Sequence, residues 1–213
     1  MQIVVDALRR SGCADRIIAV AAPAVAQAVI GVDQWLPAGP SGAANILAGL
    51  AAATPDAPVL VCLSDLPLIA PPHIETFVAG CDLEADVNLG LIRAPAFEQA
   101  FPDAPPSTFV RLRDVGPVTL SGLFAVHPNV LTRNAAVFDA LFGARKSQWS
   151  TARVLGPGLA WRWATRQIAL DWLLGFAQTR FSCRVNIVED AAPALAFDID
   201  TADDYTCVHA HVQ

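Results

Sequence analysis

The stretch Val59–Ile69, VLVCLSDLPLI, decides the fold class of this chain. Its first part, Val59–Ser64, is apolar up to its last residue, which is the pattern of a parallel strand covered on both faces. Asp65 follows directly, and parallel α/β sheets bind ligands just beyond the carboxyl ends of their strands. The stretch therefore predicts a central strand that ends in an acidic side chain at a binding site.

Two roles are open to Asp65. An ionised carboxylate at a strand end can hold a hard cation, or it can cap the helix that follows. Pro67, Pro71 and Pro72 move the start of that helix several residues along the chain, so the spacing favours the cation over the cap.

Outward from this stretch, short apolar runs alternate with helical patterns, which predicts a single α/β domain over residues 1–213 with a mostly parallel central sheet flanked by helices. Helices are predicted at residues 1–10, 24–30, 43–53, 71–80, 128–142, 155–178 and 201–211. Strands are predicted at residues 16–22, 34–36, 59–64, 87–93, 108–113, 123–126, 184–188 and 196–198, with a surface loop at 94–107. The predicted helix 155–178 carries three tryptophans, which we expect in the core or in a hydrophobic lid: Trp161, Trp163 and Trp172.

The overall composition excludes several classes of protein. With 54% hydrophobic and 16% charged residues the chain is not intrinsically disordered, and its net charge of −6 argues against binding to nucleic acid. The richest apolar stretch, Gly158–Ala177, is interrupted by Arg162, Arg166 and Asp171, so no membrane span of about 20 uncharged residues is expected. The N-terminus lacks the pattern of a signal peptide, and we expect a cytoplasmic protein.

Cysteine and histidine residues do not form a metal-binding or redox pattern. The five cysteines are irregularly spaced without a Cys-x-x-Cys pair, which favours reduced thiols. His209 and His211 are two positions apart, so they would face different sides of a helix and are not expected to share a metal ion.

A second acidic motif lies near the C-terminus, in Phe197–Thr201, FDIDT. Asp198 and Asp200 alternate along the predicted strand and so would project to the same side. Two such carboxylates repel each other unless a cation or an arginine lies between them, and a divalent metal is one solution. Asp204 has a different expected role, because Thr201 three residues before it predicts a capping box at the start of the last helix.

Two further segments are candidates for binding anions. The loop Gly39–Gly42, GPSG, leads into the helix that holds Asn45, and backbone N–H groups at a helix N-terminus can approach a phosphate or a nucleotide. This loop matches neither the Walker A motif nor the dinucleotide fingerprint. The segment Arg145–Ser147 contains Lys146, the only lysine of the chain, and either contacts an anion or ends the preceding helix as a solvated basic pair.

In their order along the chain these segments resemble the MobA-like nucleotidyltransferases, the group with a GT-A-type Rossmann-like fold that includes molybdenum-cofactor guanylyltransferase. VLVCLSDLPLI is similar to the family's strand that ends in an acidic residue followed by Pro. Phe197–Tyr205, FDIDTADDY, is similar to its closing motif, usually Asp-x-Asp-x-Pro-x-Asp. Thr108–Asp114 and Ala144–Gly156 are similar to a bacterial branch whose acceptor is generally unassigned, so the resemblance covers nearly the whole chain.

The resemblance implies a reaction and a cofactor. In the family, an acceptor phosphate attacks the α-phosphate of a Mg²⁺-bound nucleoside triphosphate and pyrophosphate leaves, a reaction that depends on positioning and charge neutralisation. The implied partners are therefore a nucleoside triphosphate and a small anionic acceptor. The implied metal ligands are Asp65 and Asp200, with Asp198 as the alternate to Asp200.

The resemblance also implies roles for residues around the metal. Asp65 and Lys146 would be the catalytic residues. Residues near the nucleotide would be Gly39, Ser41, Gly42 and Asn45. Residues near the acceptor, in addition to Lys146, would be Arg145, Ser121 and Gly122.

The chain departs from the family at two places. The glycine-rich loop that cradles the triphosphate is absent, and Thr119–Phe124, TLSGLF, lacks the asparagine of the related branch. We therefore expect an N-terminally shortened domain without its first central strand and with the apolar neighbours of that strand exposed, either because the start codon is placed too late or because the protein is degenerate. The alternatives to the enzyme are a non-catalytic nucleotide-binding or assembly module of the same fold and a nucleotide-sugar glycosyltransferase.

Overall fold

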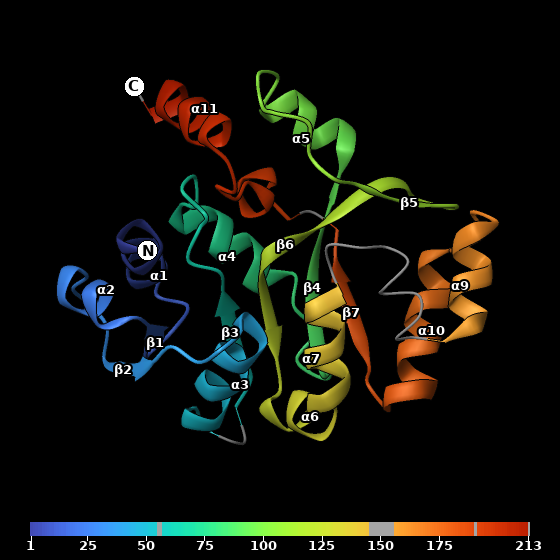
Figure 1. The fold of residues 1–213 in the computed structure, drawn as a ribbon, viewed down its shortest axis with the longest axis horizontal. Coiled ribbons are helices and arrows are strands. Elements are labelled where there is room, and N and C mark those ends of the chain that lie inside the picture. Colours follow the sequence, from blue (N-terminus) through green and yellow to red (C-terminus); the bar gives the residue numbers. More distant parts are fainter. Residues whose placement is uncertain (55–56, 145–155, 190, 213) are drawn as a thin grey trace.

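The computed structural model describes residues 1–54, 57–144, 156–189 and 191–212. The helices, shown in Figure 1, are α1 (Gln2–Ser11), α2 (Pro23–Ala28), α3 (Gly42–Ala52), α4 (Pro71–Ala79), α5 (Ala94–Ala100), α6 (Pro128–Arg133), α7 (Ala135–Ala144), α9 (Pro157–Ala164), α10 (Leu170–Phe181) and α11 (Ala202–Val212), with the 3₁₀ turn η1 (Pro193–Ala196). The strands are β1 (Ile18–Ala21), β2 (Gln34–Pro37), β3 (Val59–Cys62), β4 (Val87–Arg93), β5 (Val110–Leu112), β6 (Gly116–Val126) and β7 (Val185–Val188). No helix in these ranges is long and apolar enough to cross a membrane.

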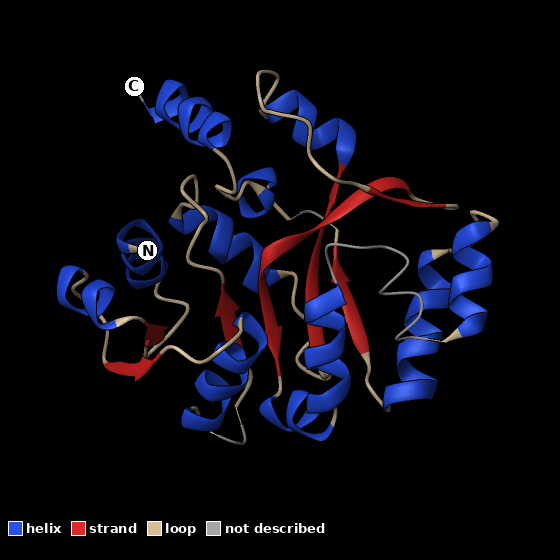
Figure 2. Ribbon diagram, in the orientation of Figure 1, coloured by secondary structure: helices blue, strands red, loops and turns tan. Residues whose placement is uncertain are grey.

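The described strands form two sheets with helices around them (Figure 2), which confirms the α/β fold class. β1 and β2 make a parallel pair of their own. The larger sheet has the order β3-β6-β4-β7, and β5 pairs with β6. Because β6 is antiparallel to both β3 and β4, and β4 is parallel to β7, three of these strands run in one direction with β6 reversed between them.

The strand Val59–Cys62 does not have the surroundings that its apolar sequence predicts. β3 lies at the end of its sheet and pairs with β6 on one side, and each of its four residues is only partly buried. Among the described strands, the prediction of a central strand covered on both faces is therefore wrong. The expected exposure of apolar strand neighbours stays a prediction, since Leu60 and Cys62 are partly buried against a core cluster.

Helices pack against the larger sheet from both faces. On one face α1 and α4 meet, where the fully buried Ile74 and Phe77 of α4 join Val5 of α1 and Leu123 of β6 in one core cluster. On the other face, Leu159 and Ile168 near α9 and α10 pack over Leu91, Leu112 and Val118. These layers hold the carboxyl ends of β3, β4 and β7 in fixed positions.

The segment 94–107 is not a continuous loop, because its first half forms the helix α5. Pro95 stands in the first turn, where the missing N–H of proline is tolerated. Phe97 and Phe101, four residues apart, face inward together, with ring centroids 5.2 Å apart, and Phe101 lies 4.9 Å from Phe197. Burial of this aromatic pair stabilises the helix. The proline-rich sequence of residues 94–107 predicted a loop there.

Two long predicted helices are each broken into two. The first breaks at Asn134, whose Nδ2 donates to the carbonyls of Val130 (3.0 Å) and Phe181 (3.3 Å). The second breaks between α9 and α10, where Arg166 has a positive φ of 55° and the chain turns so that Ile168 is buried. Tertiary contacts therefore override helical periodicity at both breaks.

The tryptophans of the predicted long helix have different surroundings. Trp172 packs against Phe176 at 5.3 Å, and the Arg162 guanidinium lies 4.7 Å from the Trp172 ring centroid. Trp161 is 71% exposed, so of the two predicted positions, core or hydrophobic lid, the core is excluded for this residue.

Candidate functional site

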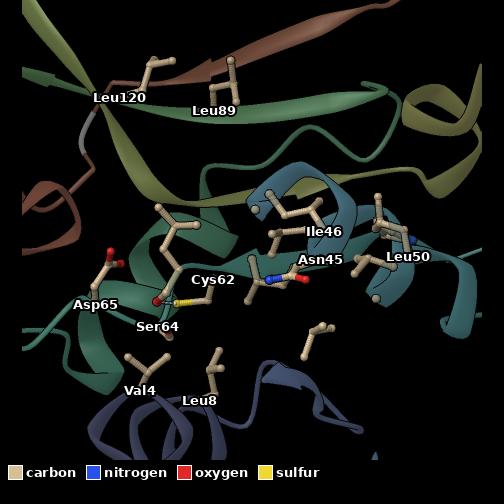
Figure 3. A pocket seen from close by; sticks show the side chains of 18 of the residues that line it. Val4, Leu8, Asn45, Ile46, Leu50, Cys62, Ser64, Asp65, Leu89 and Leu120 are labelled. Atoms are coloured by element: carbon tan, nitrogen blue, oxygen red, sulfur yellow. Dashed lines mark hydrogen bonds between the residues drawn. The ribbon is translucent and has the colours of Figure 1, made fainter. Parts of the chain in front are cut away.

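Residues of both sheets line a cavity of about 1840 Å³. It is lined by α1, α3, the edges of β1 and β3, and one face of the larger sheet. Figure 3 shows Asp65 at one end, Asn45, Ile46 and Leu50 of α3 along one side, and Val4 and Leu8 of α1 along another. The predicted site residues at this cavity are Ser41, Gly42, Asn45, Asp65, Asp198 and Asp200.

Asp65 lies three residues beyond the end of β3, at the predicted edge of the sheet. It does not cap the following helix, because α4 begins at Pro71 and the Ala70 N–H donates to Nδ1 of His73 (3.2 Å). Its neighbour Leu66 is 1% exposed and anchors the turn in the core. The capping alternative is thereby removed, and the carboxylate remains available to a ligand.

The segment Asp198–Asp200 is brought to Asp65 by a backbone hydrogen bond, in which the Ile199 N–H donates to the Asp65 carbonyl (3.2 Å). It is not a strand as predicted: η1 ends at Ala196, and residues 197–200 have no regular secondary structure. The strand prediction fails because no described strand pairs with this segment. The two aspartates nevertheless both line the cavity.

The electrostatics of Asp198 show that the carboxylates influence one another. Desolvation raises the pKa of Asp198 above its usual value, and the carboxylates of Asp200, Asp65 and Asp204 raise it further. Asp204 has a structural task as well, since its Oδ2 accepts hydrogen bonds from the Thr201 N–H (2.7 Å) and Oγ1 (2.8 Å). The predicted capping of the last helix by Thr201 and Asp204 is therefore confirmed.

The carboxylates do not form a ready-made metal cage. Among the described residues, no group of three or more His, Cys, Asp or Glu side chains is arranged to hold a metal ion. Mg²⁺ commonly takes one or two protein carboxylates and fills its remaining positions with water and substrate phosphates. Asp65 with Asp200 or Asp198 fits a site of this kind, with two protein carboxylates and the remaining positions open to water and phosphates.

Cys62 is the last residue of β3, three positions before Asp65. Desolvation raises the pKa of its thiol to about 12, and the Asp65 carboxylate adds to the shift. A thiol with this pKa stays protonated at neutral pH, so Cys62 does not supply a thiolate nucleophile here.

The predicted nucleotide loop is held by its own side chains. Ser41 caps α3, because its Oγ accepts a hydrogen bond from the Ala44 N–H (3.1 Å). Oδ1 of Asn45 accepts one from the Gly39 N–H (2.7 Å), which closes the loop back onto the helix. Ser41, Gly42 and Asn45 line the cavity, whereas Gly39 does not.

The predicted acceptor residues in β6 are packed into the protein. Ser121 donates a hydrogen bond to the Leu123 carbonyl. At Gly122 an added Cβ would lie 3.0 Å from the side chain of Leu66. Neither Ser121 nor Gly122 lines the cavity, but Thr119 and Leu120 of the same strand do.

One acidic residue at the cavity was missed by the sequence analysis. Asp139 lines the cavity from α7, where it is the one acidic residue of the sequence AAVFDALFGA. That isolated charge in an apolar helix is the signal that could have found it. Arg145, Lys146 and Ser147 lie outside the described residues.

No protein-family model matches this chain, and no curated protein matches it. Solved structures do share its fold. A hypothetical transferase from Thermus thermophilus superposes with a TM-score of 0.80 at 19% identity, covering 95% of this chain and 84% of that one.

Two further structures are cytidylyl-group enzymes by name. The 4-diphosphocytidyl-2C-methyl-D-erythritol synthase of Anaerococcus prevotii has a TM-score of 0.60 at 12% identity, with 100% of this chain and 85% of that one covered. The 2-C-methyl-D-erythritol 4-phosphate cytidylyltransferase of Thermus thermophilus has a TM-score of 0.51 at 17% identity, with 98% and 85% covered. The chain therefore has the Rossmann-like fold that these enzymes share.

Proposed function

We propose that this chain is a Mg²⁺-dependent nucleotidyltransferase of MobA-like type. It transfers a nucleoside monophosphate from a nucleoside triphosphate to a phosphorylated small-molecule acceptor and releases pyrophosphate. The observation that carries the proposal is the junction of Asp65 with the segment Asp198–Asp200 at the cavity, made by the Ile199–Asp65 backbone hydrogen bond. The fold shared with two cytidylyl-group enzymes supports the same reaction class.

Asp65 and Asp200 would hold the metal ion, with Asp198 as the alternate to Asp200. Mg²⁺ at these carboxylates would neutralise charge on the triphosphate, which is the main requirement of phosphoryl-type transfer. The α3 end of the cavity, with Ser41, Gly42 and Asn45, would orient the nucleotide. On the same proposal Lys146 and Arg145, which lie outside the described residues, would bind the anionic acceptor.

The test is a substitution that removes the charge of Asp65 and keeps its size. Asp65→Asn should reduce Mg²⁺-dependent pyrophosphate release by about 100-fold or more, because the metal would lose a ligand. The assay uses the four ribonucleoside triphosphates with a panel of sugar and alditol phosphates. Asp203→Asn is the matched control, since Asp203 is an exposed acid of α11 that does not line the cavity.

Equal turnover of Asp65→Asn and Asp203→Asn would sink the metal assignment. Release of a nucleoside diphosphate from a nucleotide sugar, in place of pyrophosphate, would replace the proposal by a glycosyltransferase. The non-catalytic alternative predicts no turnover and no Mg²⁺-dependent thermal shift with any of the triphosphates.

A further inference from the structure

The loop before α3 fixes the orientation of the Asn45 side-chain amide. The Gly39 N–H donates a hydrogen bond to Oδ1 of Asn45 (2.7 Å). A backbone N–H needs an acceptor, and in an amide side chain only the oxygen can accept. The amide of Asn45 therefore cannot turn over without breaking the hydrogen bond that closes the loop.

The nitrogen end of the same amide is free to bind a ligand. Nδ2 carries two N–H donors, and no described residue accepts a hydrogen bond from it. Asn45 is half-buried and lines the cavity, and Figure 3 shows its nitrogen on the side of Cys62 and Asp65 and its oxygen on the other side. Towards a ligand in the cavity, the side chain of Asn45 thus presents donors and no acceptor.

The chain around Asn45 is uncharged. Residues 34–54, which include β2, the loop and α3, contain no charged side chain. The carboxylates of Asp65, Asp198 and Asp200 lie at another part of the cavity wall. If Mg²⁺ and the triphosphate bind at these carboxylates, the part of the nucleotide that suits the α3 side is its neutral base.

The base would turn one particular edge to Asn45. Its sugar and phosphates leave towards Asp65, so the exocyclic group on the far side of the ring, at C4 of a pyrimidine or C6 of a purine, lies nearest to α3. This group is a keto oxygen in uracil and guanine and an amino group in cytosine and adenine. Keto oxygens accept hydrogen bonds and amino groups donate them, so the donors of Asn45 match the keto group.

Ser41, the other polar side chain of this loop at the cavity, does not make the same distinction. Its Oγ accepts a hydrogen bond from the Ala44 N–H (3.1 Å). A hydroxyl group that accepts one hydrogen bond still has a donor and a second lone pair, so it can pair with either kind of group. The discrimination therefore falls to Asn45.

We propose that Asn45 makes the cavity selective for a nucleoside triphosphate with a keto base, UTP or GTP, over one with an amino base, CTP or ATP. The selection rests on the proposed function, which brings a nucleoside triphosphate to this cavity. Nδ2 donates to the keto oxygen. An amino group in the same place would meet donors alone and would lose its hydrogen bonds to water without replacement.

The test is equilibrium binding to the full chain in the presence of Mg²⁺, measured by isothermal titration calorimetry. UTP is compared with CTP, and inosine triphosphate with ATP, because the members of each pair differ in the keto or amino group and in the proton of the neighbouring ring nitrogen. The keto member of each pair should bind about tenfold more tightly or better, as expected when one polar group is left unpaired.

A substitution at Asn45 should reverse this preference. Asn45→Asp keeps an oxygen for the Gly39 N–H and replaces both donors by an acceptor. The added charge weakens all four triphosphates, so the readout is the ratio of dissociation constants within each pair. This ratio should invert, with CTP and ATP binding about tenfold more tightly than UTP and inosine triphosphate.

The matched control is Gln27→Glu. Gln27 is exposed on α2 and does not line the cavity, so this change adds the same charge elsewhere and should leave both ratios unchanged. If Asn45→Asp does not fold, the two ratios of the natural protein decide.

The outcomes separate this selectivity from the proposed function. Equal binding within each pair overturns the selectivity alone, and so does a preference for CTP, whose cytidylyl group names the enzymes of two of the solved structures. An equal loss of all four triphosphates in Asn45→Asp, with unchanged ratios, also overturns it, because Asn45 would then contact the ribose or a phosphate. Binding of none of the triphosphates would contradict the proposed function itself.

Discussion

The side chain of His73 holds the end of the loop that carries Asp65. Its Nδ1 accepts a hydrogen bond from the Ala70 N–H (3.2 Å) at the start of α4, and only the neutral ring can accept at that atom. Desolvation lowers the pKa of His73 below its usual value of 6.5. The imidazole therefore stabilises the fold in its uncharged form.

The stability of the protein should depend on pH through this residue. Because the folded state lowers the pKa of His73, its contribution is complete above pH 6.5 and is lost as the pH falls below that value through the lowered pKa. We expect the free energy of unfolding to fall between pH 7 and pH 5 by more in the natural protein than in His73→Asn. Urea denaturation at each pH measures this difference.

The control for that comparison is the same pair of proteins at pH 8. His73→Asn keeps an acceptor for the Ala70 N–H, so the two should have nearly equal stability there, whereas His73→Ala should be about 1 kcal/mol less stable. Parallel pH profiles of the natural protein and His73→Asn would contradict the assignment.

At the scale of elements, β4 and β6 approach closely where their register shifts between Leu89 and Leu91. Gly90 lies at this irregularity. A Cβ added there would lie 2.5 Å from Oγ of Ser121 and 2.8 Å from Cβ of Ala191, and contacts this short require the neighbouring atoms to shift. Glycine inside a strand often marks such an approach of another chain segment.

Gly90→Ala should therefore destabilise the protein by about 1–3 kcal/mol, as overpacked core sites do. Gly175→Ala is the matched control, because Gly175 is exposed on α10 and an added Cβ meets nothing within 4 Å. That control should stabilise the helix by up to about 1 kcal/mol. Thermal unfolding of both variants measures the two effects. Equal melting temperatures of Gly90→Ala and Gly175→Ala would contradict the predicted cost of a side chain at Gly90.

At the scale of the whole molecule, α1 holds the small sheet in place. Arg9 pairs with Asp33 just before β2, and Oδ2 of Asp33 also accepts from the Ile17 N–H (2.7 Å) before β1. Oε1 of Gln2 accepts from the Ile30 N–H (2.9 Å). Leu8 packs in the same core cluster as Ile74 and Phe77 of α4. Within the described residues, the small sheet is thus joined to the larger one through helix packing, with no strand pair between the two sheets.

Local unfolding should therefore begin at the small sheet. A two-stranded sheet is marginal by itself, so amides of β1 and β2 should exchange faster than those of β4 and β6. Leu8→Ala, which should cost about 2–5 kcal/mol, should accelerate exchange in residues 18–37 selectively. Hydrogen exchange with mass spectrometry measures both.

The control is Leu112→Ala, which removes a buried side chain beneath α9 and α10. This variant should not change exchange in residues 18–37 ahead of the rest of the protein. Uniform acceleration across the chain by Leu8→Ala would mean that the two sheets unfold as one unit.

Much of the site follows from local sequence, and some of it cannot. The position of Asp65 after a strand and the Thr201–Asp204 cap depend on neighbouring residues, so the sequence predicts them. The meeting of Asp65 with Ile199 joins residues more than 130 positions apart, and only the family resemblance pointed to it. The packing of Ser121 against Gly90 likewise depends on strand register, which the sequence leaves open.

The alternation of apolar and helical segments, the strand before Asp65 and the end of α1 at Gly12 were determined by the sequence alone, because periodicity, turn residues and capping act over a few positions. The helix α5, the breaks at Asn134 and Arg166, and the irregular path of residues 197–200 were decided by tertiary structure. So was the position of β3 at the end of its sheet. The physical reason is that pairing and burial depend on which distant residues become neighbours, and an apolar strand has the same sequence whether its second edge is paired or open.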